Sequence, residues 1–244
     1  MPTAYDTIGI NYANLRQPDP RIGAAIGAAL GDAVTVLNVG AGTGSYEPTD
    51  RAVTALEPSI EMIRQRPAGA APVIRGCAED LPFADNAFDA VMAVLTVHHW
   101  SDRPRGLAEL RRVARGPVVI LTFDPAHQGF WLTDYLPELI SIDAAQMPPM
   151  SAYAATLGPV RITPVPIPHD CADGFLAAYW RRPSAYLDPR IRAAISCFWA
   201  MEDVEVKLER LARDLETGAW AERYGDLLRR ESCDMGYRLV VGKG

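Results

Sequence analysis

Short apolar runs rich in β-branched residues recur along the first 125 residues, and glycine, charged or other polar residues end them. Runs of this length and composition are typical of strands that are buried on both faces of a parallel sheet. One further run of this kind lies near the carboxyl terminus. We therefore expect strands at residues 34–39, 53–57, 72–75, 91–97, 117–123 and 237–241.

Apolar residues at helical spacing lie before and between these runs. Ile22, Ile26 and Leu30 are four residues apart, which places them on one face of a helix. Pro58 falls in the first turn of a second, shorter helix, and Asp102 can cap a third. Helices are expected at residues 21–31, 58–66 and from Asp102 onward. The alternation of strands and helices predicts an α/β chain with a doubly wound, Rossmann-like sheet.

This alternation stops after residue 124. Residues 129–157 are rich in aromatic side chains and are expected to be helical, and several more helices are expected within 171–230. Residues 160–168 mix apolar residues with prolines, which suits an edge strand or an extended connection, because proline cannot donate to a sheet ladder. We predict a single domain, 1–244, with a cofactor-binding core at 1–125, a mainly helical lid at about 126–235 and a last core strand at 236–244.

The first strand ends in a cluster of glycines, because residues 40–44 are Gly-Ala-Gly-Thr-Gly. Glycine lets the backbone turn tightly and approach a ligand that any Cβ would block. The next strand ends in an acid, Glu57, and in nucleotide-binding α/β folds an acid at this place accepts hydrogen bonds from ribose hydroxyls. Together the two features predict a pocket for an adenosine-containing cofactor.

The glycine spacing distinguishes between cofactors. The dinucleotide fingerprint G-x-G-x-x-G would place its third glycine at position 45, where the chain has Ser45. The G-x-G-x-G pattern of residues 40–44 resembles motif I of the class I S-adenosylmethionine-dependent methyltransferases, and residues 56–62 resemble the stretch that follows it. Residues 76–91 resemble the family's G-x-A-E-x-L-P-F … F-D-x-V block. The chain is thus similar to the small-molecule, UbiE-like type over residues 5–124 and the last strand.

The resemblance implies a seven-stranded, mostly parallel sheet and S-adenosylmethionine as the cofactor. In the family an amino-terminal segment meets the methionine carboxylate of the cofactor, and a loop after the third strand meets the adenine. The twelve residues between Gly44 and Glu57 depart from the family, whose connecting helix is longer, so less help from a helix dipole is expected. The implied cofactor-binding residues are Tyr12, Arg16, Gly40, Ala41, Gly42, Gly44, Glu57, Pro58, Met62, Ala78, Glu79 and Leu95.

Two adjacent histidines, His98 and His99, follow the fourth strand, at the edge of the sheet where ligands bind in doubly wound folds. Histidine titrates near neutral pH and suits proton removal from an acceptor hydroxyl or amine. If the strand continues, the two side chains point to opposite sides, so at most one reaches the acceptor. We expect His99, or failing it His98, to act there. The alternative is that one packs as a neutral histidine and the other faces solvent.

Other polar and aromatic residues beyond the core are further candidates for the acceptor pocket. His169, Asp170 and Asp173 follow the proline-rich segment, although a cap on a loop explains them as well. The aromatic residues can shape an apolar or cationic pocket, whereas core packing is their ordinary role. These aromatic candidates are Phe130, Trp131, Tyr135, Tyr179 and Trp180.

The bulk composition excludes several classes of partner. The chain of 244 residues carries a net charge of −6, whereas nucleic-acid binding normally requires a basic face. Its four cysteines are scattered without the spacing of metal ligands, which argues against a zinc site and suits a reducing compartment. No leader-like or membrane-length apolar run is present. We expect a cytoplasmic monomer or homodimer with a small-molecule partner and without metal, nucleic acid or membrane.

Three functions remain open. A small-molecule methyltransferase that works by direct in-line transfer leads, and the lack of an Asn-Pro-Pro-Tyr-like motif argues against amide or nucleobase nitrogen as the acceptor. A nicotinamide-dependent oxidoreductase is disfavoured by Ser45 and by the lack of a Tyr-x-x-x-Lys pair. A protein that binds S-adenosylmethionine without catalysis would have no acceptor pocket beside the sulfonium.

Overall fold

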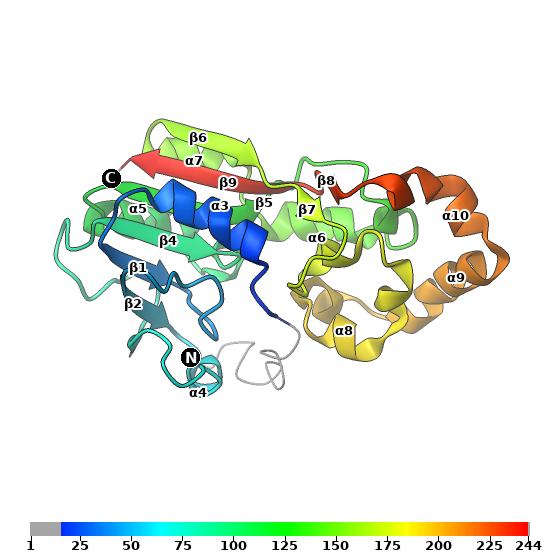
Figure 1. Ribbon diagram of the computed structural model, residues 1–244, viewed down its shortest axis with the longest axis horizontal. Helices are drawn as coiled ribbons and strands as arrows, with labels where there is room; N and C mark the ends of the chain where they lie inside the picture. Colours follow the sequence, from blue (N-terminus) through cyan, green and yellow to red (C-terminus); the bar gives the residue numbers. More distant parts are fainter. Residues whose placement is uncertain (1–15, 244) are drawn as a thin grey trace.

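A seven-stranded sheet organises residues 16–243, the part of the chain that this computed structural model describes (Figure 1). Its order is β3-β2-β1-β4-β5-β9-β6, and every neighbouring pair is parallel except those that β9 makes with β5 and β6. The predicted seven-stranded, mostly parallel, doubly wound sheet is confirmed. Its strands are β1 (Thr35–Val39), β2 (Ala52–Glu57), β3 (Val73–Arg75), β4 (Ala90–Val94), β5 (Pro117–Phe123), β6 (Val160–Pro164) and β9 (Tyr237–Lys243).

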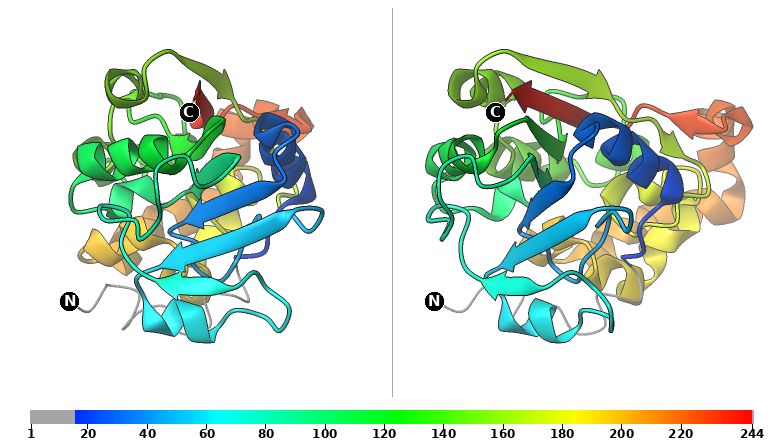
Figure 2. Two further views of the ribbon diagram at one scale, coloured as in Figure 1. Left: turned by 90° about the vertical axis from the view of Figure 1, so that its left-hand side faces the viewer. Right: turned by 60° about the vertical axis from the view of Figure 1, so that its left-hand side comes forward.

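Alternate residues along the central strands pack into two separate cores, one on each face of the sheet. Ala90 and Met92 of β4 belong to one core, and Val91 and Ala93 belong to the other. This is the result of a pleated strand with helices on both faces, and it explains why the strand sequences are apolar throughout. Figure 2 shows the two helical layers on opposite sides of the sheet. The covering helices are α3 (Pro20–Leu30) on one face, and α5 (Arg103–Val113) and α7 (Met150–Leu157) on the other.

Side-chain caps set the starts of the helices. The Asp19 carboxylate accepts from the backbone N–H of Arg21, and Pro20 occupies the first turn of α3. The Ser59 hydroxyl accepts from Met62, so α4 begins at Ile60 and is shorter (Ile60–Arg64) than the expected 58–66. Asp102 caps α5 as predicted, because its carboxylate accepts from the backbone N–H of Arg105.

The fourth strand ends earlier than the sequence indicated. We expected a strand over 91–97, but β4 stops at Val94. The reason is Leu95, which adopts a φ of +50° and turns the chain out of the extended conformation. The next residues form a 3₁₀ helix, η1 (Val97–His99), so the two histidines lie on a tight turn and not on an extended strand.

The lid lies beyond the carboxyl ends of the strands, toward which the arrowheads of β1 and β4 point in Figure 1. We use "lid" for residues 126–149 and 165–235. The intervening residues form α7 and the edge strand β6, which belong to the layers of the sheet. The lid elements are η2 (Trp131–Asp134), α6 (Glu138–Gln146), β7 (Ile167–Pro168), η3 (Leu176–Tyr179), η4 (Pro183–Leu187), α8 (Pro189–Ala193), η5 (Ser196–Ala200), α9 (Val204–Thr217), α10 (Ala219–Tyr224), η6 (Gly225–Arg229) and β8 (Ser232–Cys233).

Aromatic side chains form the centre of the lid. The ring of Trp131 lies edge-on to Tyr186 and Trp220, with centroids 5.6 and 5.2 Å apart, and its Nε1 donates to the carbonyl of Trp180 at 2.7 Å. Such pairs add to the free energy gained by burial. Phe130, Trp131, Tyr135, Tyr179 and Trp180 are all buried in this core, so the packing interpretation of these five residues holds.

Candidate active site

The glycine turn after β1 has a backbone that other residues adopt only with strain. Gly40 has a φ of +68° and Gly42 a φ of +53°. The backbone N–H groups of Gly40 and Ala41 both donate to the carbonyl of Leu56, which holds the turn against the end of β2. A Cβ on Gly40 would lie 2.0 Å from Oγ1 of Thr96, whereas a Cβ on Gly42 would enter open space. Gly40 is therefore required for packing, and Gly42 leaves room for a ligand.

The Glu57 carboxylate at the end of β2 is buried against this turn. Its Oε2 accepts from the backbone N–H of Gly42 at 2.8 Å, and its Oε1 accepts from the N–H of Ser59 at 2.9 Å. A carboxylate offers about four acceptor positions, so it can accept hydroxyl groups while it holds the turn. Glu57 thus orders the glycine turn as well as facing the cavity, a double role that the sequence did not reveal.

A buried ion pair supports the turn where the family has a longer helix. Glu47 and Arg66 lie 2.8 Å apart with side chains only 8% and 5% exposed. Arg66 also donates to the carbonyl of Gly42 at 3.3 Å, and Asn38 donates to Glu47 at 3.1 Å. Sequence reasoning missed both ion-pair residues. The short connection after Gly44 was the signal, because it required another support for the glycine turn.

The Glu79 side chain joins the loop after β3 to the start of α5 by hydrogen bonds. Its Oε1 accepts from the backbone N–H of Ser101 at 2.8 Å, from the Ser101 hydroxyl at 2.8 Å and from the N–H of Asp102 at 3.2 Å. Burial raises the pKa of the Glu79 carboxyl, but these hydrogen bonds outweigh burial, and the net shift is downward. The predicted contact of Ala78 and Glu79 with adenine stays a prediction, and one oxygen of Glu79 already serves the fold.

These elements enclose a cavity of about 510 Å³ at the switch point between β1 and β4, a size typical of cofactor sites. Its wall contains Gly40, Ala41, Gly42, Glu57, Pro58 and Met62. The same wall also contains Ala78, Glu79, Leu95, His99 and Arg16. Gly44 lies behind the wall, because a Cβ there would meet Glu47 and Arg66. Tyr12 lies outside the described residues.

The chemistry of this cavity fits S-adenosylmethionine. Gly42 leaves open the space that a Cβ would fill, and Glu57 places a carboxylate on the wall. Asn38 also lines the cavity, and its buried Oδ1 has no hydrogen-bond donor in the described part of the chain. A buried acceptor of this kind is costly until a donor such as the cofactor's amino group reaches it.

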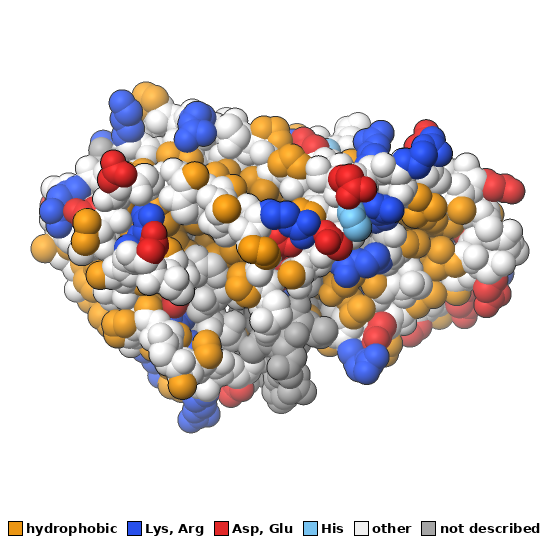
Figure 3. All heavy atoms as spheres, viewed as in Figure 1, with side chains coloured by type: hydrophobic (Ala, Val, Ile, Leu, Met, Phe, Trp, Pro, Cys, Tyr) orange, Lys and Arg blue, Asp and Glu red, His pale blue; other side chains and the backbone are white. Residues whose placement is uncertain are grey.

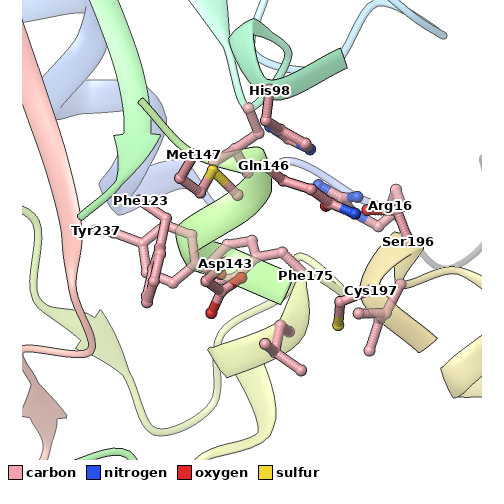
Figure 4. Close-up of a pocket in the computed structure, with 13 residues that line it drawn as sticks. Arg16, His98, Phe123, Asp143, Gln146, Met147, Phe175, Ser196, Cys197 and Tyr237 are labelled. Atoms are coloured by element: carbon pink, nitrogen blue, oxygen red, sulfur yellow. The ribbon is translucent and has the colours of Figure 1, made fainter. Parts of the chain in front are cut away.

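A second cavity lies under the lid, and it shares Arg16 and Leu95 with the first (Figure 4). His98, Phe123 and Tyr237 line it from the sheet side. From the lid, α6 contributes Asp143 and Gln146, and Met147 follows directly after this helix. Phe175 and Cys197 come from later turns. The cofactor cavity therefore adjoins a second, mostly apolar cavity. Residues of the sheet and residues of the lid together enclose this second cavity.

Arg16 ties the segment before α3 to the lid. Its Nε donates to Oδ1 of Asp173 at 2.6 Å, and the Tyr46 hydroxyl donates to Oδ2 of the same carboxylate at 2.8 Å. Asp173 is buried, so these contacts fix the position of Arg16 between the two cavities. Arg16 lines both cavities, and a contact between it and the methionine carboxylate of the cofactor stays a prediction.

The two histidines face different cavities. Their rings lie 3.8 Å apart, and His98 lines the cavity under the lid while His99 lines the cofactor cavity. Burial, the neighbouring His99 and the cations of Arg16 and Arg103 lower the pKa of His98 well below 6.5. Burial and the same two cations lower the pKa of His99 to about 4. Both rings are therefore neutral at pH 7, as a proton acceptor must be.

The remaining polar candidates lie away from both cavities. His169 contacts Glu231 at 3.3 Å, and Asp170 pairs with Arg21 at 2.7 Å on the surface. Within residues 16–243, no group of three His, Cys, Asp or Glu side chains is placed to hold a metal ion.

Comparisons with known proteins identify the family. Residues 37–120 match the family model described as a methyltransferase domain. A solved structure of a putative methyltransferase from an antibiotic biosynthesis pathway of Anabaena variabilis is 36% identical, covers 94% of this chain and 99% of its own, and superposes with a TM-score of 0.87. The chain belongs to the class I S-adenosylmethionine-dependent methyltransferase family. The predictions of the family and of S-adenosylmethionine as the cofactor are confirmed.

Curated methyltransferases match a smaller part of the chain. Demethylmenaquinone methyltransferase of Renibacterium salmoninarum is 39% identical over 121 residues, which are 46% of this chain and 49% of that protein. The chloroplastic 2-methyl-6-phytyl-1,4-hydroquinone methyltransferase 2 of Oryza sativa subsp. japonica is 32% identical over 116 residues, 43% of this chain and 33% of that protein. The matched stretch thus spans a third to a half of the length of these relatives.

Proposed function

We propose that this methyltransferase-family protein transfers the methyl group of S-adenosylmethionine to a small-molecule acceptor bound under the lid. The observation that carries the proposal is the second cavity, which shares Arg16 and Leu95 with the cofactor cavity. A protein that only bound the cofactor would need no such space next to it. The second cavity therefore favours catalysis over binding alone.

The residues of the chain position the reactants and exclude water. When bound, S-adenosylmethionine supplies an activated methyl group, and proximity and orientation are the main contributions of the protein. Gly42 leaves room for the cofactor, and Glu57 would hold its ribose hydroxyls. Leu95 adopts a left-handed conformation between the two cavities, and strain of this kind tends to occur at functional sites. The aromatic lid keeps bulk water from the acceptor.

The test is an assay for methyl transfer. The protein is incubated with S-adenosylmethionine labelled in its methyl group and with a panel of phenols, carboxylates and amines. We expect label to appear in at least one acceptor only when the protein is present, together with an equal amount of S-adenosylhomocysteine. Binding of S-adenosylhomocysteine without transfer to any acceptor of the panel would favour a protein that binds the cofactor without catalysis.

His98 is the better candidate for contact with the acceptor, because it lines the cavity under the lid. His98→Gln is expected to lower kcat on a confirmed acceptor about 10²-fold, since a positioned base contributes 10²–10⁴-fold, and to leave the affinity for S-adenosylhomocysteine within about two-fold. Because the pKa of His98 is lowered, the wild-type rate is expected to hold as the pH falls through 6.5. The measurements are steady-state rates against pH and calorimetric titrations.

His99→Gln and His169→Gln are the matched variants for this experiment. His99 faces the cofactor cavity, so its replacement is expected to affect the affinity for S-adenosylhomocysteine more than kcat. His169 contacts Glu231 away from both cavities, and its replacement is expected to change neither. Full turnover by both His98→Gln and His99→Gln would show that the two histidines are structural.

The surroundings in which the protein works are also part of the proposal. We expect no nucleic-acid partner, and acidic and basic side chains are interspersed on the face shown in Figure 3. None of the four cysteines is in a disulfide, as expected of a protein in the cytoplasm. We expect a monomer or a homodimer. Along residues 16–243, no helix is both long enough and apolar enough to cross a bilayer.

A further inference from the structure

The cavity under the lid contains a carboxylate that meets no counter-ion among residues 16–243. Asp143 of α6 lines this cavity and points into it (Figure 4). In the described part of the chain, no hydrogen bond or ion pair reaches its carboxylate, and burial alone raises the pKa of the carboxyl, to about 6. At pH 7.5 the group is therefore mainly ionised. An ionised carboxylate in an apolar enclosure is costly unless an opposite charge or a donor meets it.

Aromatic and neutral groups surround this carboxylate. The ring of Tyr237 lies 5.5 Å from that of Phe123 and 4.5 Å from that of Phe175, so the three form one aromatic wall. Burial, with a contribution from the Asp143 charge, raises the pKa of the Tyr237 hydroxyl and of the Cys197 thiol, which keeps both groups neutral. Neither the aromatic wall nor the thiol can neutralise the carboxylate.

The other charged and titratable groups of the cavity lie toward the cofactor. Arg16 borders both cavities, and its Nε is held by Asp173 at 2.6 Å. His98 is neutral at pH 7. The guanidinium of Arg16 and the carboxylate of Asp143 lie apart in Figure 4. The cavity is thus polarised: Asp143 lines it apart from the residues shared with the cofactor cavity, and no opposite charge within residues 16–243 compensates this carboxylate.

A protonated amine has the charge and the geometry to meet this carboxylate. It would donate to the Asp143 carboxylate in a charge-assisted hydrogen bond, and aromatic faces attract cations within about 6 Å of the ring centre. We propose that the cavity under the lid selects acceptors that carry a protonated amine, with the amine bound to Asp143 and the methylated atom at the opposite end, beside Leu95 and Arg16. This inference rests on the proposed methyl transfer and adds the substrate class.

Three probes of nearly equal size test the proposal. Tyramine, tyrosol and 4-hydroxyphenylacetate share a phenol ring and differ at the far end, which is an ammonium, a hydroxyl or a carboxylate. Each is titrated calorimetrically at pH 7.5 into protein saturated with S-adenosylhomocysteine. We expect tyramine to bind about ten-fold or more tightly than tyrosol, since hydrogen bonds to charged groups are that much stronger, and 4-hydroxyphenylacetate to bind most weakly.

The Asp143→Asn variant removes the charge and keeps the shape, so it is expected to fold. It should lose the preference, with tyramine affinity about ten-fold lower or more and tyrosol affinity nearly unchanged. Asp226→Asn on the lid surface is the matched control and should behave as wild type. Lowering the pH from 7.5 to 5 should weaken tyramine binding in wild type, because Asp143 becomes protonated near pH 6, but not in Asp143→Asn.

Several results would overturn this proposal. Equal affinities for tyramine and tyrosol, no binding of any probe, or a preference for tyramine that survives Asp143→Asn would each contradict it. Tighter binding of 4-hydroxyphenylacetate would assign recognition to Arg16 and also contradict it. A separate titration with S-adenosylhomocysteine keeps the two proposals distinguishable: if this ligand binds and the probes show no charge preference, only the substrate class fails.

Discussion

Replacing Glu57 with glutamine is expected to lower the affinity for S-adenosylhomocysteine about ten-fold or more. The carboxylate accepts from the N–H groups of Gly42 and Ser59 and would also accept ribose hydroxyls. Glutamine has one acceptor oxygen and places an NH₂ where the other oxygen was, so at least one donor loses a charged acceptor worth about 1.5–3 kcal/mol. Calorimetric titration of the variant next to wild type measures the change.

The Glu57→Gln experiment needs a control for stability, because the residue also orders the glycine turn. We expect the free energy of unfolding to fall by about 1–2 kcal/mol, from one imperfectly satisfied buried donor. Titrations are therefore made well below the unfolding temperature. Glu61→Gln is the matched control, because Glu61 lies on α4, four residues after Glu57, and is not part of the cavity wall. This variant should retain wild-type affinity. Unchanged affinity in Glu57→Gln would show that the acid does not hold the ribose.

Gly42→Ala is expected to abolish most cofactor binding while the protein stays folded. The added Cβ meets no protein atom within 4 Å and instead enters the cavity, where the cofactor would lie. The φ of +53° adds strain of about 1–2 kcal/mol for alanine. Affinity for S-adenosylhomocysteine should therefore drop about ten-fold or more with only a modest loss of thermal stability. Calorimetry and a thermal melt separate the two effects.

Two other glycines provide matched comparisons for Gly42→Ala. Gly40→Ala should destabilise the fold strongly, because its Cβ would lie 2.0 Å from Oγ1 of Thr96, a β-branched side chain with little freedom to move. Gly27→Ala, at an open position in α3, should raise stability by roughly 0.5–1 kcal/mol and leave binding unchanged. Wild-type binding in Gly42→Ala would mean that the cofactor does not approach this turn.

Local sequence patterns were sufficient to locate the core strands and the glycine turn. Each core strand is a short apolar run, and in β5 the expected bounds, Pro117–Phe123, are those observed. The glycines at 40 and 42 adopt positive φ, in the tight turn that the glycine cluster predicted. These features could be predicted because each depends on the residue itself or on its immediate neighbours.

Features that depend on distant partners could not be predicted in this way. The Glu47–Arg66 pair joins residues 19 positions apart, and nothing in either neighbourhood marks them as partners. The left-handed turn at Leu95 follows directly on the end of β4, before the two histidines, yet leucine rarely adopts this conformation. Asp143 resembles any surface acid in sequence, and only the folding of α6 over the sheet places it in a cavity.

The division of residues 126–235 between the sheet layers and the lid also depends on contacts that are distant in sequence. The composition of this range indicated helices without saying which of them belong to the sheet layers. The hydroxyl of Tyr153 on α7 donates to Oγ1 of Thr122 on β5 at 2.9 Å, and this contact across 31 residues anchors α7 to the sheet. The position of β6 likewise follows from its pairing with β9, which is distant in sequence.

Paired calorimetric titrations of the unmodified protein with S-adenosylhomocysteine and with NAD test the central claim most directly. The G-x-G-x-G turn, the open space at Gly42 and the Glu57 carboxylate predict saturable binding of one S-adenosylhomocysteine per chain and no response to NAD. Saturable binding of NAD with no response to S-adenosylhomocysteine would contradict the assignment of this cavity.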